Sequence, residues 1–291
     1  MKKAIVLLLI LLHVSCKTDP SKSSEGKEPL LLKQFAFTPN AKPIISVHRG
    51  GKGLENYPEN CLESIKYIND SIPAIYEIDI AKTKDNILVL MHDNSLDRTT
   101  TGEGDLTTYT YSELNQFNLE DDYGNKTAFK IPLFKTVLIW AKQNDVILTI
   151  DIKKSVDVTE VVALIRETQA EAISIIITYD LKQALAAYQA APDLMLSVSG
   201  RNEEELDWLL HSKIPTQNML AFTGTRLSTK AFYNKVHRYG IPCILGSLGN
   251  LDNQAEAKGD HLYQEWVEMG VDIIATDRPF EVAASLNIKK D

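Results

Sequence analysis

Short apolar runs rich in β-branched residues alternate along the chain with longer amphipathic stretches. Most of these runs are bounded on at least one side by Gly, Pro, Asn or Asp, and this pattern is typical of a buried strand. We expect eight such strands, at Ile44–Val47, Ala74–Ile80, Val146–Ile152, Ile173–Thr178, Leu194–Val198, Met219–Phe222, Cys243–Leu245 and Val271–Ala275.

The stretches between these runs carry start signals of helices. Asp157 is followed three residues later by Glu160, which predicts a capping box at the start of an apolar stripe. Asn202, followed three residues later by Glu205, predicts the start of a second helix. Ser228 is expected to open a third helix, which stops at Gly240.

Apolar strands that alternate with helices indicate a parallel sheet covered by helices. Eight of them predict an α/β fold in which the sheet closes into a TIM-like (β/α)8 barrel. A doubly wound open sheet has the same local pattern and is the alternative. No second polar linker interrupts residues 31–291, so we expect this part of the 291-residue chain to be one barrel domain.

A ninth apolar run at Ile87–Met91 follows the second strand after only a few residues. A parallel crossover needs a dozen residues or more, so the pair must form an extra β-hairpin. With the turn near Asp85, His92 returns alongside Glu77 and Asp79.

The first residues predict export and attachment to a membrane. Two lysines, an apolar run and Cys16 after small residues are typical of a bacterial lipoprotein signal, so we expect residues 1–15 to be a signal peptide. Residues 16–30 then form a lipid-anchored cysteine and a polar, flexible tether. A plain signal peptide with an incidental Cys16 is the alternative. Lys17 and Thr18 bring no acidic cluster, which favours a domain on the periplasmic face.

Composition narrows the choice of partner. The formal net charge of −8 argues against nucleic acid, because phosphate backbones require clustered Lys and Arg. Cys61 and Cys243 lack the spacing of a zinc site. Such a pair can form a disulfide in an exported protein, but we interpret both as buried apolar residues.

Three acidic residues at strand ends indicate a cation site. Glu77 and Asp79 are two residues apart in a strand, so both carboxylates project from one face. Asp151 ends the next long strand and shares a face with Lys153. Carboxylates crowded in an apolar setting need a compensating cation or basic groups, and their oxygens suit Mg²⁺ or Ca²⁺. An edge strand that turns its polar face to water is the simpler explanation of Glu77 and Asp79.

His48 and His92 each end a short strand, where barrel enzymes place catalytic groups. Arg49 follows His48 and can hold a phosphate by two hydrogen bonds, and the glycines after it allow main-chain N–H groups to approach such an anion. A tight turn is the simpler explanation of these glycines. His211, His237 and His261 lie on expected helices, where a structural role is favoured.

These pieces, in this order, resemble the glycerophosphodiester phosphodiesterase family. The resemblance rests on His48-Arg49-Gly50, Pro58-Glu59-Asn60, Glu77-x-Asp79, Thr83-Lys84-Asp85, His92-Asp93, Leu96-x-Arg98-Thr99-Thr100, Ile131-Pro132-x-Phe134, Asp151-x-Lys153 and Thr276-Asp277-x-Pro279. It implies a barrel enzyme that releases an alcohol and sn-glycerol 3-phosphate, with His48 and His92 as general acid and base. It further implies a divalent metal held by Glu77, Asp79 and Asp151, with Arg49 and Lys153 on the phosphate.

Two departures from the family pattern affect the expected substrate. Asp151 stands where the family usually has Glu, and Ile244-Leu245-Gly246-Ser247 stands where Trp-Thr-x-Asn is usual. A phosphodiesterase for another diester, such as a phospholipid or lysophospholipid, is therefore one alternative. A non-catalytic lipoprotein that binds phosphorylated ligands is another.

Overall fold

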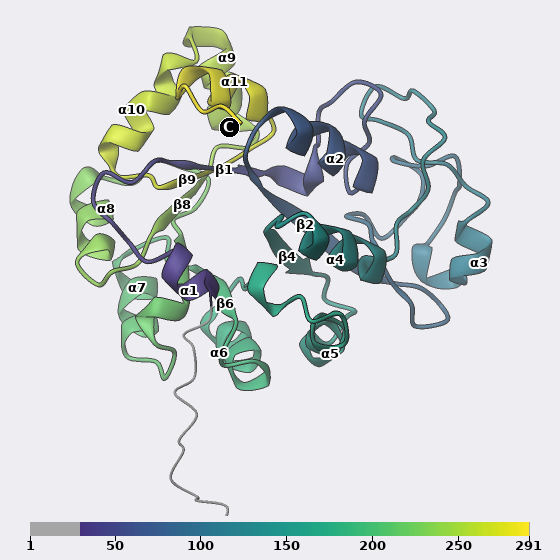
Figure 1. Cartoon of the computed structure of the whole chain (residues 1–291), viewed down its shortest axis with the longest axis horizontal. Coiled ribbons are helices and arrows are strands. Elements are labelled where there is room, and N and C mark those ends of the chain that lie inside the picture. Colours follow the sequence, from purple (N-terminus) through teal and green to yellow (C-terminus); the bar gives the residue numbers. More distant parts are fainter. Residues whose placement is uncertain (1–29, 291) are drawn as a thin grey trace, which may run out of the picture.

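The computed structural model describes residues 30–290, in which eight parallel strands close into a barrel (Figure 1). The strand order runs from β1 through β9, β8, β7, β6, β5 and β4 to β2, and β1 also pairs with β2. That last pairing closes the sheet, so the open-sheet alternative is wrong. The barrel strands are β1 (Ile44–Val47), β2 (Ile75–Lys82), β4 (Leu148–Ile152), β5 (Ser174–Ile177), β6 (Met195–Ser199), β7 (Met219–Phe222), β8 (Cys243–Gly246) and β9 (Ile273–Thr276).

All nine expected strands are present, and their ends lie within two residues of the sequence prediction. The hairpin is confirmed, because β3 (Leu88–Leu90) runs antiparallel to β2 with Ile80 opposite Leu90. The amide of Met91 donates to the carbonyl of Asp79, so His92 follows directly beside the acidic end of β2.

Helices surround the barrel and pack their apolar faces on the outer side of the strands (Figure 1). They are α2 (Leu62–Ser71), α4 (Phe134–Gln143), α5 (Val158–Thr168), α6 (Leu181–Ala190), α7 (Glu203–Leu210), α8 (Lys230–His237), α9 (Asn250–Lys258), α10 (His261–Met269) and α11 (Pro279–Ser285). No helix of the described part of the chain is both long and apolar enough to cross a bilayer.

The capping signals mostly mark the true helix starts. Asp157 and Glu160 form the expected capping box, and the Asn202 side chain accepts from the amide of Glu205. The prediction for Ser228 was wrong by one residue. The Thr229 side chain caps α8 instead, whereas the amide of Ser228 donates to the hydroxyl of Tyr233.

The barrel interior is closed at the amino ends of its strands by a short helix, α1 (Leu30–Gln34), and the residue after it. Leu31, Leu32 and Phe35 pack against the first inward-facing side chains of the strands, including Ile75 and Ile175. Because this end is filled with apolar side chains, the open end of the barrel lies at the carboxyl ends of the strands. The expected signal peptide and nearly all of the tether lie outside the described residues.

A long excursion between β3 and α4 has a small core of its own. It contains α3 (Tyr111–Leu114), and its buried residues include Leu96, Leu106 and Leu119. Cys61, just before α2, also packs into this core. The excursion thus lies beside the turn after β1 and supports one side of the open end (Figure 1).

The two cysteines of the barrel are free and buried, as the sequence interpretation required. Burial raises the pKa of the Cys61 thiol to about 12, and burial also raises the pKa of Cys243. We expect neither residue to react with iodoacetamide in the native protein and both to react in urea, because only the exposed thiolate is nucleophilic. Peptide mass spectrometry after alkylation measures this, and rapid native labelling of either cysteine would contradict it.

Candidate active site

A pocket of about 300 Å³ opens at the carboxyl ends of the strands. Along β1, β2 and β4, alternate residues point inward. On β2, Ile75 therefore packs in the apolar cluster at the amino ends of the strands. Glu77 and Asp79, two and four residues later, face the same way and line the pocket. The predicted residues that line the pocket are His48, Glu77, Asp79, His92 and Asp151.

Glu77, Asp79 and Asp151 converge in this pocket. Asp79 and Asp151 are directly paired across β2 and β4, and each of the three residues has a carboxylate oxygen within 4.8 Å of the others. The Lys153 ammonium lies 2.5 Å from Asp79 Oδ1 and 3.7 Å from Asp151 Oδ2. One lysine for three carboxylates leaves an excess of negative charge, which fits a site for a hard divalent cation.

The electrostatics of the cluster differ from one carboxyl to the next. Loss of hydration and the charges of Asp79 and Asp151 hold the pKa of Glu77 well above its usual value. Burial also raises the pKa of Asp151, although a hydrogen bond from Tyr179 opposes this. Burial would raise the pKa of Asp79 too, but the charge and hydrogen bond of Lys153, together with Asn60, hold that pKa below normal.

Asn60 and Tyr179 orient two of these carboxylates. Asn60 Nδ2 donates to Asp79 Oδ2 at 2.7 Å, and Asn60 Oδ1 accepts from the Asp79 amide at 2.9 Å. The Tyr179 hydroxyl donates to Asp151 Oδ2 at 2.7 Å. Burial raises the pKa of Tyr179, so its hydroxyl stays protonated as a donor. Both contacts fix the direction of carboxylate oxygens, as outer-shell groups do in metal sites.

Each of the two histidines is held by a carboxylate at Nδ1. His48 Nδ1 lies 2.6 Å from Asp277 Oδ1, and His92 Nδ1 lies 2.6 Å from Asp93 Oδ1. Burial acts to raise the pKa of Asp93, but hydrogen bonds from Arg98 and His92 lower this pKa to about 2. Burial also acts to raise the pKa of Asp277, but the hydrogen bond and charge of His48 hold this pKa below its usual value. Both carboxylates are therefore ionised, and each fixes the orientation of its histidine through Nδ1, so that Nε2 is the second ring nitrogen.

The turn His48-Arg49-Gly50 is held in an uncommon conformation. Arg49 has φ of 48°, its amide donates to Glu77 Oε2 at 2.6 Å, and its carbonyl accepts from the Asn60 amide at 2.6 Å. Gly50 has φ of +62°, and a Cβ there would lie 3.0 Å from the Ile65 side chain. The tight turn and its packing on α2 thus explain this glycine without an anion.

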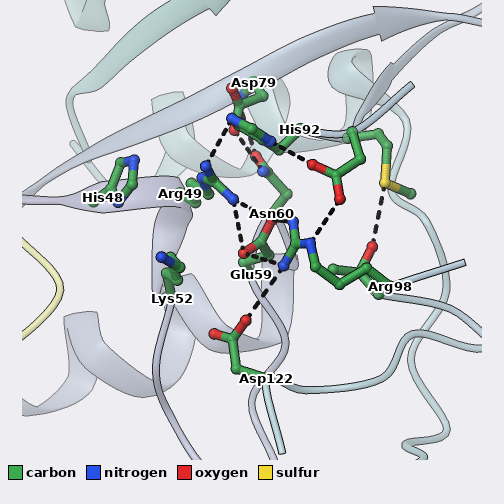
Figure 2. A network of polar contacts seen from close by, with 12 residues as sticks. His48, Arg49, Lys52, Glu59, Asn60, Asp79, His92, Arg98 and Asp122 are labelled. Atoms are coloured by element: carbon green, nitrogen blue, oxygen red, sulfur yellow. Dashed lines mark hydrogen bonds and ion pairs between the residues drawn. The ribbon is translucent and has the colours of Figure 1, made fainter. Parts of the chain in front are cut away.

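Arg49 lies at the edge of the site rather than in the cation cluster. Figure 2 shows its guanidinium between Glu59 and His92, with Nη2 donating to His92 Nε2 at 2.7 Å. Nη1 donates to both Glu59 oxygens, at 3.1 and 3.2 Å, while Nε is buried without a partner. A buried donor without a partner is uncommon in folded proteins.

Glu59 connects the turn after β1 with the excursion between β3 and α4, through Arg49 and Arg98 (Figure 2). Its carboxylate is almost fully buried and accepts from Arg49 and also from Arg98 Nη2, at 2.6 Å. Arg98 Nε in turn donates to Asp93 Oδ2 at 2.6 Å, and Asp93 holds His92. The excursion is thereby joined to both histidine-bearing turns through charge-assisted hydrogen bonds, which are among the stronger ones in proteins.

Sequence reasoning missed several residues that support the site. Asp277, Asp93, Glu59, Asn60 and Arg98 were each part of a quoted motif, but none was given a role, and Tyr179 carried no signal at all. Conversely, the histidines expected to be structural lie away from the pocket. His237, for example, contacts Asp272 at 2.8 Å near the amino ends of β8 and β9.

A barrel with a carboxylate cluster and two carboxylate-held histidines at the carboxyl ends of its strands has the form of a TIM-barrel hydrolase site. The model of the Glycerophosphoryl diester phosphodiesterase family matches residues 48–281, and the chain belongs to this family. The match spans the turn after β1 to the start of α11, and so contains every residue of the site described above.

Three similar proteins illustrate the relationship. The crystal structure of a glycerophosphoryl diester phosphodiesterase from Parabacteroides distasonis has a TM-score of 0.80 and 32% identity, over 88% of this chain and 90% of that chain. An Oleispira antarctica phosphodiesterase in complex with sn-glycerol-3-phosphate shares the fold, with a TM-score of 0.67, 17% identity and coverage of 88% and 99%. A glycerophosphodiester phosphodiesterase from Bacillus altitudinis is 35% identical over 114 residues, 38% of this chain and 46% of that protein. The chain spans about half the length of the curated relatives it matches.

Proposed function

We propose that this protein hydrolyses glycerophosphodiesters to an alcohol and sn-glycerol 3-phosphate, with the help of a divalent cation. The observation that carries the proposal is the convergence of two oriented histidines and three carboxylates on one pocket. Membership of the phosphodiesterase family supports the reaction class. The product bound to the fold-related Oleispira protein motivates the choice of sn-glycerol 3-phosphate as the species to assay.

The residues present fit a cation such as Mg²⁺ or Ca²⁺. Glu77, Asp79 and Asp151 would hold it, because they supply oxygen ligands with excess negative charge in a confined space. When bound, such an ion neutralises phosphate charge and stabilises the charge that develops during displacement at phosphorus.

The histidines divide the proton transfers between them. Hydrolysis requires a base that takes a proton from the attacking nucleophile and an acid that gives one to the departing alcohol. His48 and His92 suit this need because each has Nδ1 bound to a carboxylate, which leaves Nε2 as the nitrogen that exchanges a proton; on His92 this nitrogen is in contact with Arg49 Nη2. Arg49 and Lys153 would bind the non-bridging phosphate oxygens, and Arg49 would exchange its contact with His92 for one with the phosphate.

The test is release of glycerol 3-phosphate from glycerophosphocholine and glycerophosphoethanolamine by the full chain in mild detergent. Reactions contain EDTA, Mg²⁺ or Ca²⁺. Turnover that requires a cation is the expected result. No release with any cation, from a protein whose circular dichroism shows it folded, would refute the proposal.

The hydrogen bond from Tyr179 to Asp151 is expected to matter for cation affinity. Tyr179→Phe should weaken Mg²⁺ or Ca²⁺ binding about tenfold, because outer-shell partners of ligands typically contribute that much. In an Asp151→Glu background the loss should be smaller, since the longer side chain no longer depends on this contact for its placement. Isothermal titration measures both, and Tyr239→Phe, an exposed tyrosine elsewhere, is the matched control. Equal affinity in Tyr179→Phe and the parent protein would contradict the prediction.

We further infer that the protein is exported and anchored through a lipid on Cys16, with the domain on the periplasmic face. The basic and apolar start of the chain supports this. The closed end of the barrel, beside α1, would then be the end nearest the tether, and the pocket would open at the other end. Incorporation of labelled palmitate that disappears in Cys16→Ser, but not in Cys61→Ser, is the expected result. Equal labelling of both variants would refute the anchor.

A further inference from the structure

A second cluster of metal-binding side chains lies at the amino ends of the strands, at the opposite end of the barrel from the pocket. His237 is the last residue of α8, Cys243 is the first residue of β8, and Asp272 immediately precedes β9. Each of the three offers one ligand atom, and these atoms lie within 4.8 Å of one another. The spacing along the chain did not indicate this cluster, because its members come from three separate elements.

Main-chain contacts hold the three side chains together. The Asp272 amide donates to the Cys243 carbonyl at 3.0 Å, and the Cys243 amide donates to Asp272 Oδ2 at 2.7 Å. His237 Nε2 lies 2.8 Å from the same carboxylate oxygen. Gly270 permits the loop before β9 to approach α8, because a Cβ there would lie 2.7 Å from Cβ of Tyr233 and 3.5 Å from Cε1 of His237. The fold itself therefore brings the cluster together.

The donor atoms of this cluster suit zinc rather than the hard cations expected in the pocket. Thiolate, imidazole and carboxylate groups bind Zn²⁺, whereas Mg²⁺ and Ca²⁺ prefer oxygen ligands alone. One thiolate and one carboxylate also balance the two charges of the ion, so the filled site is neutral. Nitrogen and oxygen ligands of a tetrahedral ion lie about 3.3 Å apart, so His237 and Asp272 need to separate by only about half an ångström.

His237 also borders an open groove beside α8, through which an ion and water can reach the cluster. The groove has a volume of about 540 Å³ and is lined by Phe37, Ala231, Asn234, His237 and Arg238. Arg238 is exposed to water and salt, which weaken its repulsion of a cation. The Phe37 ring stacks on His237, with centroids 4.1 Å apart. Phe37 follows α1, so an ion on His237 would join α8, β8 and β9 beneath the segment that closes the barrel.

We propose that His237, Cys243 and Asp272 form a zinc-binding site with water as the fourth ligand. The ligand class is Zn²⁺ or another divalent transition metal that accepts a thiolate. Binding releases the thiol proton of Cys243 to solvent, because only the thiolate is a ligand. The site is independent of the proposed phosphodiesterase function, since none of its three residues lines the pocket.

Cobalt reports on this site separately from the carboxylates of the pocket. Co²⁺ bound to a thiolate gives a charge-transfer absorption band in the near ultraviolet, and the acidic cluster contains no sulfur. The full chain, freed of metal and kept reduced in mild detergent, is titrated with Co²⁺ in the presence of excess Mg²⁺. We expect a thiolate band that saturates as Co²⁺ is added and disappears when Zn²⁺ displaces it.

Variants assign the band to the three residues. Cys243→Ala should abolish it, whereas Cys61→Ala and Cys16→Ser should retain it, because Cys61 lies in the core of the excursion and Cys16 precedes the domain. His237→Gln and Asp272→Asn should each weaken Co²⁺ binding at least about tenfold, since a direct ligand contributes no less than an outer-shell partner. His211→Gln, at the carboxyl end of α7, is the matched control and should leave the affinity unchanged.

The outcomes decide the inference without any measurement of activity. The absence of a thiolate band in the parent protein would overturn it, and so would a band that survives in Cys243→Ala. Parent affinity in both His237→Gln and Asp272→Asn would show binding by a thiol alone and would overturn the three-ligand site. If circular dichroism shows that Cys243→Ala does not fold, these two variants decide the question in the same way. Release of glycerol 3-phosphate is tested separately, so either proposal can fail without the other.

Discussion

His48→Ala is expected to lower kcat for glycerophosphocholine by about 10²- to 10⁴-fold, the range for loss of a general acid or base. The reason is the geometry at the end of β1. His48 lines the pocket beside the carboxylates, and Asp277, 229 positions away in sequence, holds its Nδ1 at 2.6 Å. No other described histidine except His92 lines the pocket, so no neighbour can take over the proton transfer.

Steady-state choline release measures this loss, with the cation affinity determined separately to show that the metal site is intact. His261→Ala is the matched control, because His261 is exposed at the start of α10 and does not line the pocket. An activity within threefold of the parent protein in His48→Ala would contradict the catalytic assignment of this residue.

Glu77→Gln is expected to abolish the response of the protein to divalent cations. Without a cation, Glu77 is crowded by two other carboxylates, and the pKa of Glu77 is raised by lost hydration and by these neighbouring charges. The neutral amide removes like-charge repulsion, so the melting temperature in EDTA should equal or exceed that of the parent protein. The same change removes a ligand, and kcat/KM should fall by about 10²-fold or more, since a cation provides several kcal/mol to the transition state.

Differential scanning fluorimetry with and without cation tests the stability half of this prediction. At a concentration 100 times its Kd, a bound ion stabilises the parent protein by about 2.7 kcal/mol. For a domain of this size, that corresponds to a rise of about 5 °C or more. The variant should show no rise, and Glu204→Gln, an exposed residue of α7, should behave like the parent protein. A full cation-induced rise in Glu77→Gln would exclude Glu77 as a ligand.

The positions of the strands and the presence of a hairpin were predictable because they depend on local chemistry. β-branched runs between turn residues identify buried strands, and the few residues between β2 and β3 allow no parallel crossover. Glu77 and Asp79 face the same way because the side-chain period of a strand is two residues. These features need no knowledge of distant parts of the chain.

Barrel closure required the tertiary structure. The local pattern is the same in an open sheet, and only the pairing of β1 with both β2 and β9 distinguishes the two. The same applies to the carboxylate cluster. Asp151 joins Glu77 and Asp79 because β4 pairs with β2 in the register that places Asp151 opposite Asp79, and this register depends on packing against the helices.

The sequence by itself therefore determined where the strands lie along the chain, which histidines and acids are candidates for the site, and the family resemblance. The tertiary structure decided which residues support them, since Asp277, Tyr179 and Asn60 reach their partners from separate loops. The physical reason is that side-chain period and turn chemistry act over a few residues, whereas a site is assembled by burial and pairing across the whole barrel.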